Sequence, residues 1–177
     1  CPLNESQLNV YLDIIANNKF DSYHIPLFME ISKKYGIDAI CSALNEILHI
    51  HPILEMCISD DFEVPYLIKG SKPIILMESE IDDGFILEFI NEPFDLNLNL
   101  CRFLIVDNND NYLLLGVFHH IIFDALSETA FKNDMQAILD AKNVNIDDSF
   151  LKVSAFAQQI PDEPEYLDAY DFYANLL

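Results

Sequence analysis

The chain has 177 residues, of which 51% are hydrophobic and only 4 are glycines, so its composition is typical of one folded domain with a core. Its 30 acidic residues outnumber 9 basic residues, which gives a net charge of −21. Because so negative a surface repels phosphate groups, we expect neither a nucleic-acid partner nor a membrane partner.

Four cysteines lie far apart, within apolar stretches and without a CxxC spacing: Cys1, Cys41, Cys57 and Cys101. This pattern predicts reduced thiols and a cytoplasmic protein. The chain begins at Cys1 and not at Met, so we expect it to be part of a longer protein.

The first predicted element is a helix that begins after Asn4, because Asn4 and Gln7 have the spacing of a capping box. It ends near residues 17–18. An apolar run over residues 23–31 predicts a strand, and Pro26 within it favours an edge strand or a bulge.

A second helix is predicted to be capped by Asp38 and to end before Pro52. Its apolar residues recur at the spacing of one buried helical face: Ile40, Ala43, Leu44, Ile47 and Leu48. Farther along, the sequence predicts strands at 53–58, 64–68, 74–78, 100–106 and 112–118, and helices at 82–90, 127–141, 150–160 and 165–177. A turn at 108–111 makes a hairpin of the last two strands, and the alternation of helices and strands indicates an α/β or α+β fold.

The residues that indicate chemistry follow that hairpin. An apolar strand leads into His119 and His120, and three apolar residues separate these from Asp124 and Ala125. Since adjacent side chains of a strand point in opposite directions, one histidine should face a cleft and the other the interior. Histidine can take and return a proton near neutral pH, so the segment suits proton transfer during attack by an amine or hydroxyl group.

Two other interpretations of the segment remain. The histidines could both be packed side chains beside a surface aspartate. They could also bind a metal, but neighbouring histidines are poor ligands for one ion and no third ligand has typical spacing, so we predict no metal.

The segment resembles the HHxxxDG signature of condensation domains of nonribosomal peptide synthetases, which belong to the chloramphenicol acetyltransferase-like superfamily. His119, His120 and Asp124 match the signature, whereas Ala125 replaces its glycine. Three other stretches resemble family motifs in family order: residues 2–7 (the opening helix), residues 51–54 and residues 92–102. The second of these lacks two arginines, which Ile50 and Glu55 replace.

The resemblance implies a two-layer α/β (α+β) sandwich with helices on a mixed sheet. It further implies that residues 1–177 are the N-terminal subdomain of a condensation domain, and that the C-terminal half is absent from this chain. Such domains join an acyl group to an aminoacyl group, each held as a thioester on the phosphopantetheine of a carrier protein. The expected partners are carrier proteins, the other half of the domain and an adenylation domain, and no cofactor is bound directly.

The resemblance also implies roles for the motif residues. His120 acts on the attacking amine, His119 supports it, and Asp124 braces the loop through a salt bridge. Arg102, the only arginine, is a candidate partner for Asp124, although it could instead meet solvent or a neighbouring carboxylate. Ala125 is a candidate tunnel-lining residue, where its methyl group could narrow the path of the phosphopantetheine arm.

Three alternatives to amide formation stay open. The substitutions at positions 50, 55 and 125 are also compatible with a degenerate domain that binds carrier proteins or serves as a scaffold. Within the superfamily, an epimerisation domain or an acyltransferase that uses coenzyme A would share the motif. In every case we expect the isolated half to be inactive.

Overall fold

The computed structural model describes residues 1–61, 64–79 and 81–157. Its centre is a four-stranded sheet in which three neighbouring strands are antiparallel and the last pair is parallel, so the sheet is mixed. In spatial order the strands are β1 (His24–Ser32), β6 (Asn111–His119), β5 (Cys101–Asn108) and β4 (Ile75–Glu78).

The two central strands form the predicted hairpin. β5 and β6 are joined by a tight turn in which Asn109 has a φ of 35°, a conformation that asparagine tolerates well. Both strands are almost wholly buried, because elements cover both faces of the sheet, and this explains their continuous apolar sequence. The prediction of an edge strand around Pro26 is also confirmed, since β1 pairs with β6 alone within the described sheet.

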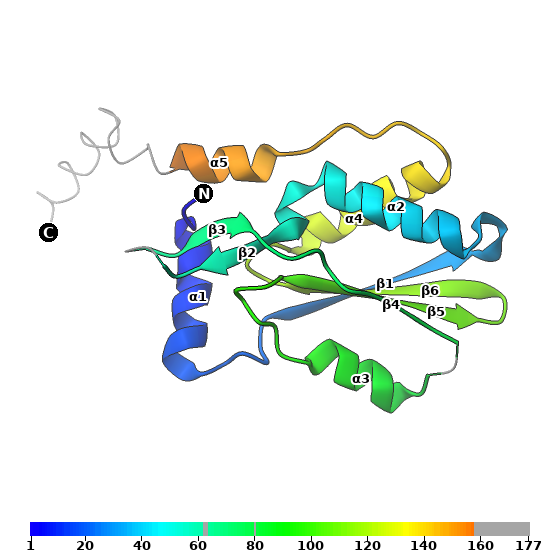
Figure 1. Ribbon diagram of the computed structural model, residues 1–177, viewed down its shortest axis with the longest axis horizontal. Helices are drawn as coiled ribbons and strands as arrows, with labels where there is room; N and C mark the ends of the chain where they lie inside the picture. The colour runs from blue at the N-terminus through cyan, green and yellow to red at the C-terminus, as the bar shows by residue number, and fades with distance from the viewer. Residues whose placement is uncertain (62–63, 80, 158–177) are drawn as a thin grey trace, which may run out of the picture.

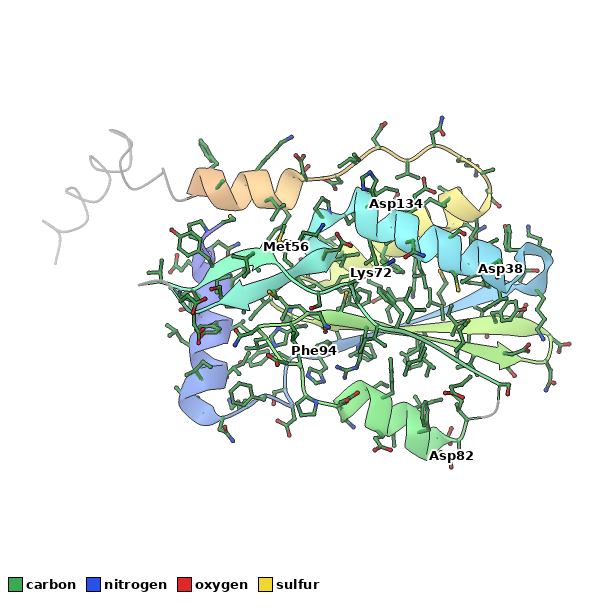
Figure 2. The ribbon with its side chains drawn as sticks, in the orientation of Figure 1. Asp38, Met56, Lys72, Asp82, Phe94 and Asp134 are labelled. Carbon is green, nitrogen blue, oxygen red and sulfur yellow. The ribbon has the colours of Figure 1, made fainter. Side chains whose placement is uncertain are left out.

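Helices cover the sheet from two sides (Figure 1). α2 (Ile37–Ile50) and α4 (Ala125–Leu139) pack together over one face, and the shorter α3 (Asp83–Asn91) lies on the other side. The predicted apolar stripe of α2 is buried, as expected. The prediction that Asp38 caps this helix is wrong: the N-cap is Gly36, and Asp38 lies in the first turn, where its charge suits the helix dipole (Figure 2).

At one end of the sheet, α1 (Glu5–Asn17) stands beside a two-stranded ribbon of β2 (Met56–Ser59) and β3 (Tyr66–Lys69) (Figure 1). The capping box is confirmed: the amide N–H of Gln7 donates to Asn4 Oδ1, and the amide N–H of Asn4 donates to Gln7 Oε1, both at 3.0 Å. The strand predicted over 53–58 is partly wrong, because Pro52–Glu55 forms a 3-10 helix, η2, before β2 begins.

The last described element is α5 (Ser149–Ala157), which agrees with the start of the helix predicted at 150–160. The helix predicted at 165–177 lies outside the described residues. None of the helices described here is both long and apolar enough to cross a membrane. Three cysteines, Cys41, Cys57 and Cys101, have thiol pKa values that burial raises.

Candidate functional site

The site lies where β6 ends, and the sheet fixes both histidines there through their backbones. The N–H of His119 donates to Leu100 O and the N–H of His120 donates to Tyr23 O, each at 2.8 Å. The side chain of His119 is 1% exposed, whereas His120 is exposed to solvent. The prediction that the two rings face opposite environments is confirmed.

A single hydrogen bond sets the tautomer of His120. Its Nδ1 lies 2.8 Å from the carbonyl oxygen of Phe123. A carbonyl oxygen can only accept, so Nδ1 carries the hydrogen, and in the neutral ring Nε2 keeps an unshared electron pair. The ring therefore has a proton acceptor on the side that is not engaged by its own loop.

The exposed ring of His120 lines an open groove of about 320 Å³. One wall is α1 with its N-cap, which contributes Asn4, Ser6, Gln7 and Val10, and another is Phe150 at the start of α5. The loop after β6 and the first turn of α4 form the remainder. A proton acceptor at the wall of an open groove can reach a bound substrate, as general base catalysis requires.

Buried side chains hold the loop that carries His120. The ring of Phe123 stacks on that of Phe118 with centroids 3.8 Å apart, and Ile121 is 2% exposed. The N–H of Ile121 donates to His119 Nδ1 at 3.1 Å, and its carbonyl accepts from Gln7 Nε2 at 2.8 Å. The loop is thus anchored to the sheet and to α1 at once.

His119 is the structural member of the pair. Burial, together with the nearby rings of His24 and His120, lowers the pKa of His119 to about 3, so the ring is neutral at any physiological pH. Because Nδ1 accepts from the N–H of Ile121, the ring hydrogen is on Nε2.

Asp124 forms no salt bridge with Arg102, so the candidate pairing of these two residues is wrong. Its Oδ1 accepts from the N–H and from the hydroxyl of Ser127, both at 2.8 Å, and it is the N-cap of α4. These two hydrogen bonds are the main cause that lowers the pKa of Asp124 below its usual range. Its role here is to start the helix that follows the motif.

Arg102 meets neither Asp124 nor solvent, being only 7% exposed. Its Nε and Nη2 donate to the carbonyl of Phe89 at 3.1 and 2.8 Å, and Nη2 also donates to Glu92 O at 2.6 Å. The guanidinium carbon lies 4.2 Å from the centroid of the Phe94 ring. Arg102 thus satisfies the last carbonyl groups of α3, which no sequence pattern indicated.

Ala125 is the first residue of α4 and is exposed. The groove is lined by its neighbours Asp124 and Ser127 and not by Ala125, as far as the described residues define it. A part in a tunnel remains a prediction for this residue.

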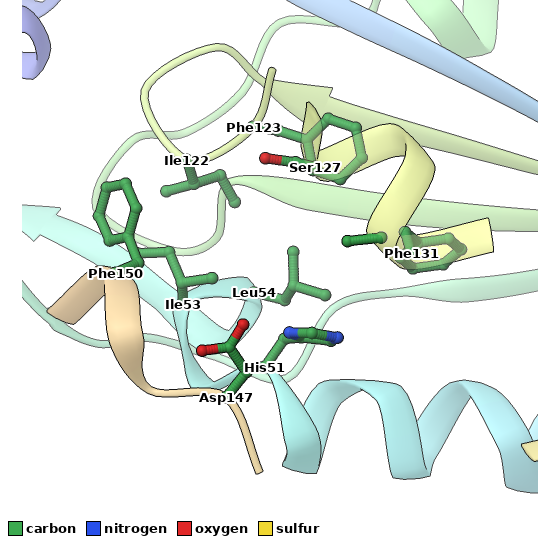
Figure 3. Close-up of a pocket in the computed structure, with 10 residues that line it drawn as sticks. His51, Ile53, Leu54, Ile122, Phe123, Ser127, Phe131, Asp147 and Phe150 are labelled. Atoms are coloured by element: carbon green, nitrogen blue, oxygen red, sulfur yellow. The ribbon is translucent and has the colours of Figure 1, made fainter. Parts of the chain in front are cut away.

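A smaller cavity of about 120 Å³, which the sequence did not indicate, adjoins the groove (Figure 3). His51 and Asp147 lie on one side of it, opposite Phe123 and Ser127, and both of the latter also line the groove. His51 Nε2 is 2.8 Å from Asp134 Oδ2, which ties the end of α2 to α4. Across the described residues, no three metal-binding side chains come together.

Comparisons with known proteins agree with this architecture. The chain is similar to the starter condensation domain of rhizomide synthetase RzmA, with a TM-score of 0.78 and 11% identity over 98% of this chain and 48% of that one. A condensation domain described for chain release from the enacyloxin polyketide synthase gives a TM-score of 0.69 and 21% identity, covering 88% of this chain and 34% of that one. The X-domain in complex with OxyB, from teicoplanin biosynthesis, gives 0.77 and 18%, covering 91% and 38%.

These similarities confirm the predicted mixed α/β fold, and the chain spans about half the length of the RzmA domain. The model of the condensation-domain family matches residues 1–172. The chain therefore belongs to the condensation-domain family.

Proposed function

We propose that this chain is the N-terminal half of a condensation domain that forms an amide bond in nonribosomal peptide synthesis, with His120 as its catalytic residue. The observation that carries the proposal is the ring of His120: its Nδ1 is engaged by Phe123 O at 2.8 Å, so the free Nε2 can accept a proton in an open groove. The substrates are an acyl and an aminoacyl thioester, each on the phosphopantetheine of a carrier protein.

In the proposed reaction, the amine of the downstream group attacks the carbonyl carbon of the upstream thioester. A C–N bond forms and the C–S bond breaks, while the proton lost by the amine ends on the departing sulfur. Nε2 of His120 takes this proton or orients the amine for attack, and can return the proton to the sulfur. His119 and Asp124 support the reaction through the loop and α4, without contacting the substrate.

The partners follow from this proposal. Two carrier proteins deliver the thioesters, an adenylation domain loads one of them, and a C-terminal half supplies the other wall of the groove. The coverage of relatives supports the last point, since this chain matches 48% of the RzmA domain. We place the protein in the cytoplasm because its cysteines are reduced and lie far apart in the sequence.

The test uses the complete domain with loaded donor and acceptor carrier proteins. The parent should yield the dipeptidyl product, and His120→Ala should slow its formation by about 10²- to 10⁴-fold, the usual contribution of a general base. His49→Ala is the matched control, because His49 is an exposed histidine on α2. An unimpaired His120→Ala variant would refute the catalytic assignment, and product from the 177-residue chain alone would refute the half-domain assignment.

A non-catalytic scaffold is the second candidate. It is favoured by the alanine at position 125, and by the similarity to an X-domain described in complex with OxyB. The same assay distinguishes the two functions: a parent domain that binds carrier proteins but makes no product supports the scaffold.

A further inference from the structure

Gln7 is one of only four buried polar or charged residues in the described chain, and both ends of its amide are used. It is 5% exposed. Its Oε1 accepts from the N–H of Asn4 at 3.0 Å, which completes the cap of α1. Its Nε2 donates to the carbonyl of Ile121 at 2.8 Å, across 114 residues of sequence.

The peptide groups around His120 are consequently held from both directions. On the N-terminal side, the N–H of His120 donates to Tyr23 O of the segment that precedes β1. On the C-terminal side, Ile121 donates to the ring of His119 and accepts from Gln7. Of these contacts, the one from Gln7 is the one that links the loop to α1.

The capping box does not by itself explain a glutamine at this position. Its Oε1 serves the cap, and a glutamate oxygen does that equally well. An ionised carboxylate has no hydrogen to donate, however, and would oppose its charge to the carbonyl oxygen of Ile121. The hydrogen bond to Ile121 therefore explains why this position has an amide and not a carboxylate.

We propose that Gln7 is a positioning residue for His120: through Ile121 it fixes the loop in the shape that keeps Nδ1 of His120 on Phe123 O and leaves Nε2 free. The effect of Gln7 on catalysis rests on the proposed function, whereas its effect on the orientation of the His120 ring does not. Without the contact, the loop of residues 120–124 loses its tie to α1 and the ring of His120 samples other orientations.

The first experiment measures the ring and not the activity. Nitrogen chemical shifts of the His120 imidazole, recorded by NMR on the 177-residue chain at neutral pH, report which ring nitrogen carries the hydrogen. The parent should show hydrogen on Nδ1. Gln7→Glu and Gln7→Met, which both lack the donor, should shift population toward hydrogen on Nε2.

Acidification supplies a signature that a general loss of stability does not produce. As the carboxyl group introduced by Gln7→Glu becomes protonated, its O–H can again donate to Ile121 O, so the parental shifts should return. Gln7→Met has no group to protonate and should show no such return. The parent chain, measured at the same pH values, is the reference for both variants.

The matched control is Ile14→Val, because Ile14 lies on the same helix, is fully buried and does not contact the loop through a hydrogen bond. It should lower the melting temperature while the His120 shifts stay parental. The proposal is overturned if Gln7→Met lowers the melting temperature as much as Ile14→Val does and still keeps the parental His120 shifts. Gln7 would then be only a packing residue.

Activity provides the second experiment, in the complete domain. Gln7→Met should lower kcat about 10- to 100-fold with KM nearly unchanged, since a displaced ring affects the chemical step more than binding. A fall in kcat equal to that of Ile14→Val would contradict the positioning role. If His120→Ala proves fully active, the proposed function is wrong. The NMR experiment would still test whether Gln7 orients the His120 ring, because it does not measure activity.

Discussion

Arg102 and Asp124 lie on two sides of the end of β6, the first buried and the second beside the groove, and they carry opposite charges. In both cases the charge of the side chain is compensated by the end of a helix. On the buried side, the guanidinium of Arg102 takes the last carbonyl groups of α3 as its acceptors. On the groove side, the carboxylate of Asp124 accepts a hydrogen bond from the N–H of Ser127 in the first turn of α4. Each charge is therefore met by the helix end of opposite polarity and not by the other charge.

The difference between the sides lies in solvent. Arg102 and His119 are buried, so water cannot compensate for the loss of a hydrogen-bond partner or for a charge placed on the His119 ring. Such changes therefore lower the free energy of unfolding by their full amount. Asp124 and His120 are exposed, so water can replace much of what a substitution removes. Substitutions on the buried side should accordingly affect folding, and those on the groove side should affect chemistry.

The largest expected effect on stability comes from Arg102→Ala. The variant leaves the carbonyls of Phe89 and Glu92 without their donor and opens a space beside Phe94. We expect the free energy of unfolding to fall by about 3 kcal/mol, as measured by urea denaturation.

Lys33→Ala is the control for the loss of a cation. Lys33 pairs with Asp107 on the surface, and the loss should be about 0.5 kcal/mol. Equal effects of the two variants would show that burial does not distinguish these sites.

Acid should destabilise the buried side next. The folded chain holds the pKa of His119 at about 3, below the 6.5 of a free imidazole. The contribution of the neutral ring is thus complete above about pH 6.5 and is lost as the pH falls from there toward 3. Between pH 7 and pH 5, we expect the free energy of unfolding to fall by about 2 kcal/mol.

His119→Gln checks the origin of this slope, because it removes the titrating ring. The neighbouring ring of His24, whose pKa burial also lowers, contributes in the same direction and remains in the variant. The slope over this range should be clearly smaller in His119→Gln than in the parent, and an unchanged slope would assign the effect to other groups.

The smallest effect is expected on the groove side. Asp124→Ala removes the cap of α4 and should cost about 1 kcal/mol, whereas Asp124→Asn keeps an acceptor for the N–H of Ser127 and should cost less. Thermal unfolding of the two variants compares them. A loss of several kcal/mol for Asp124→Asn would mean that the charge, and not the cap, is what α4 requires.

Local patterns explain most of what the sequence predicted. The capping box at Asn4, the stripe of α2 and the hairpin of β5 and β6 depend on neighbours along the chain, and all three are confirmed. The opposite fates of His119 and His120 followed from strand alternation alone.

Two errors were local, the helix cap assigned to Asp38 and the start of the strand predicted at 53–58, and the others concern contacts between distant segments. The partner of Arg102 could not be inferred, since its acceptors are backbone carbonyls, which every residue possesses. The pair of His51 and Asp134, 83 residues apart, and the link from Gln7 to Ile121 depend likewise on how helices pack against each other. The spacing of residues along the sequence does not predict how distant helices pack against each other.

The raised thiol pKa values of Cys41, Cys57 and Cys101 have a chemical consequence under the proposed function, in which the substrates are thioesters. A thiolate readily exchanges with a thioester, whereas a protonated thiol does so poorly. Protonated sulfur atoms at these three positions would leave the activated acyl groups of the proposed reaction on their carriers, so the domain would not acylate its own cysteines.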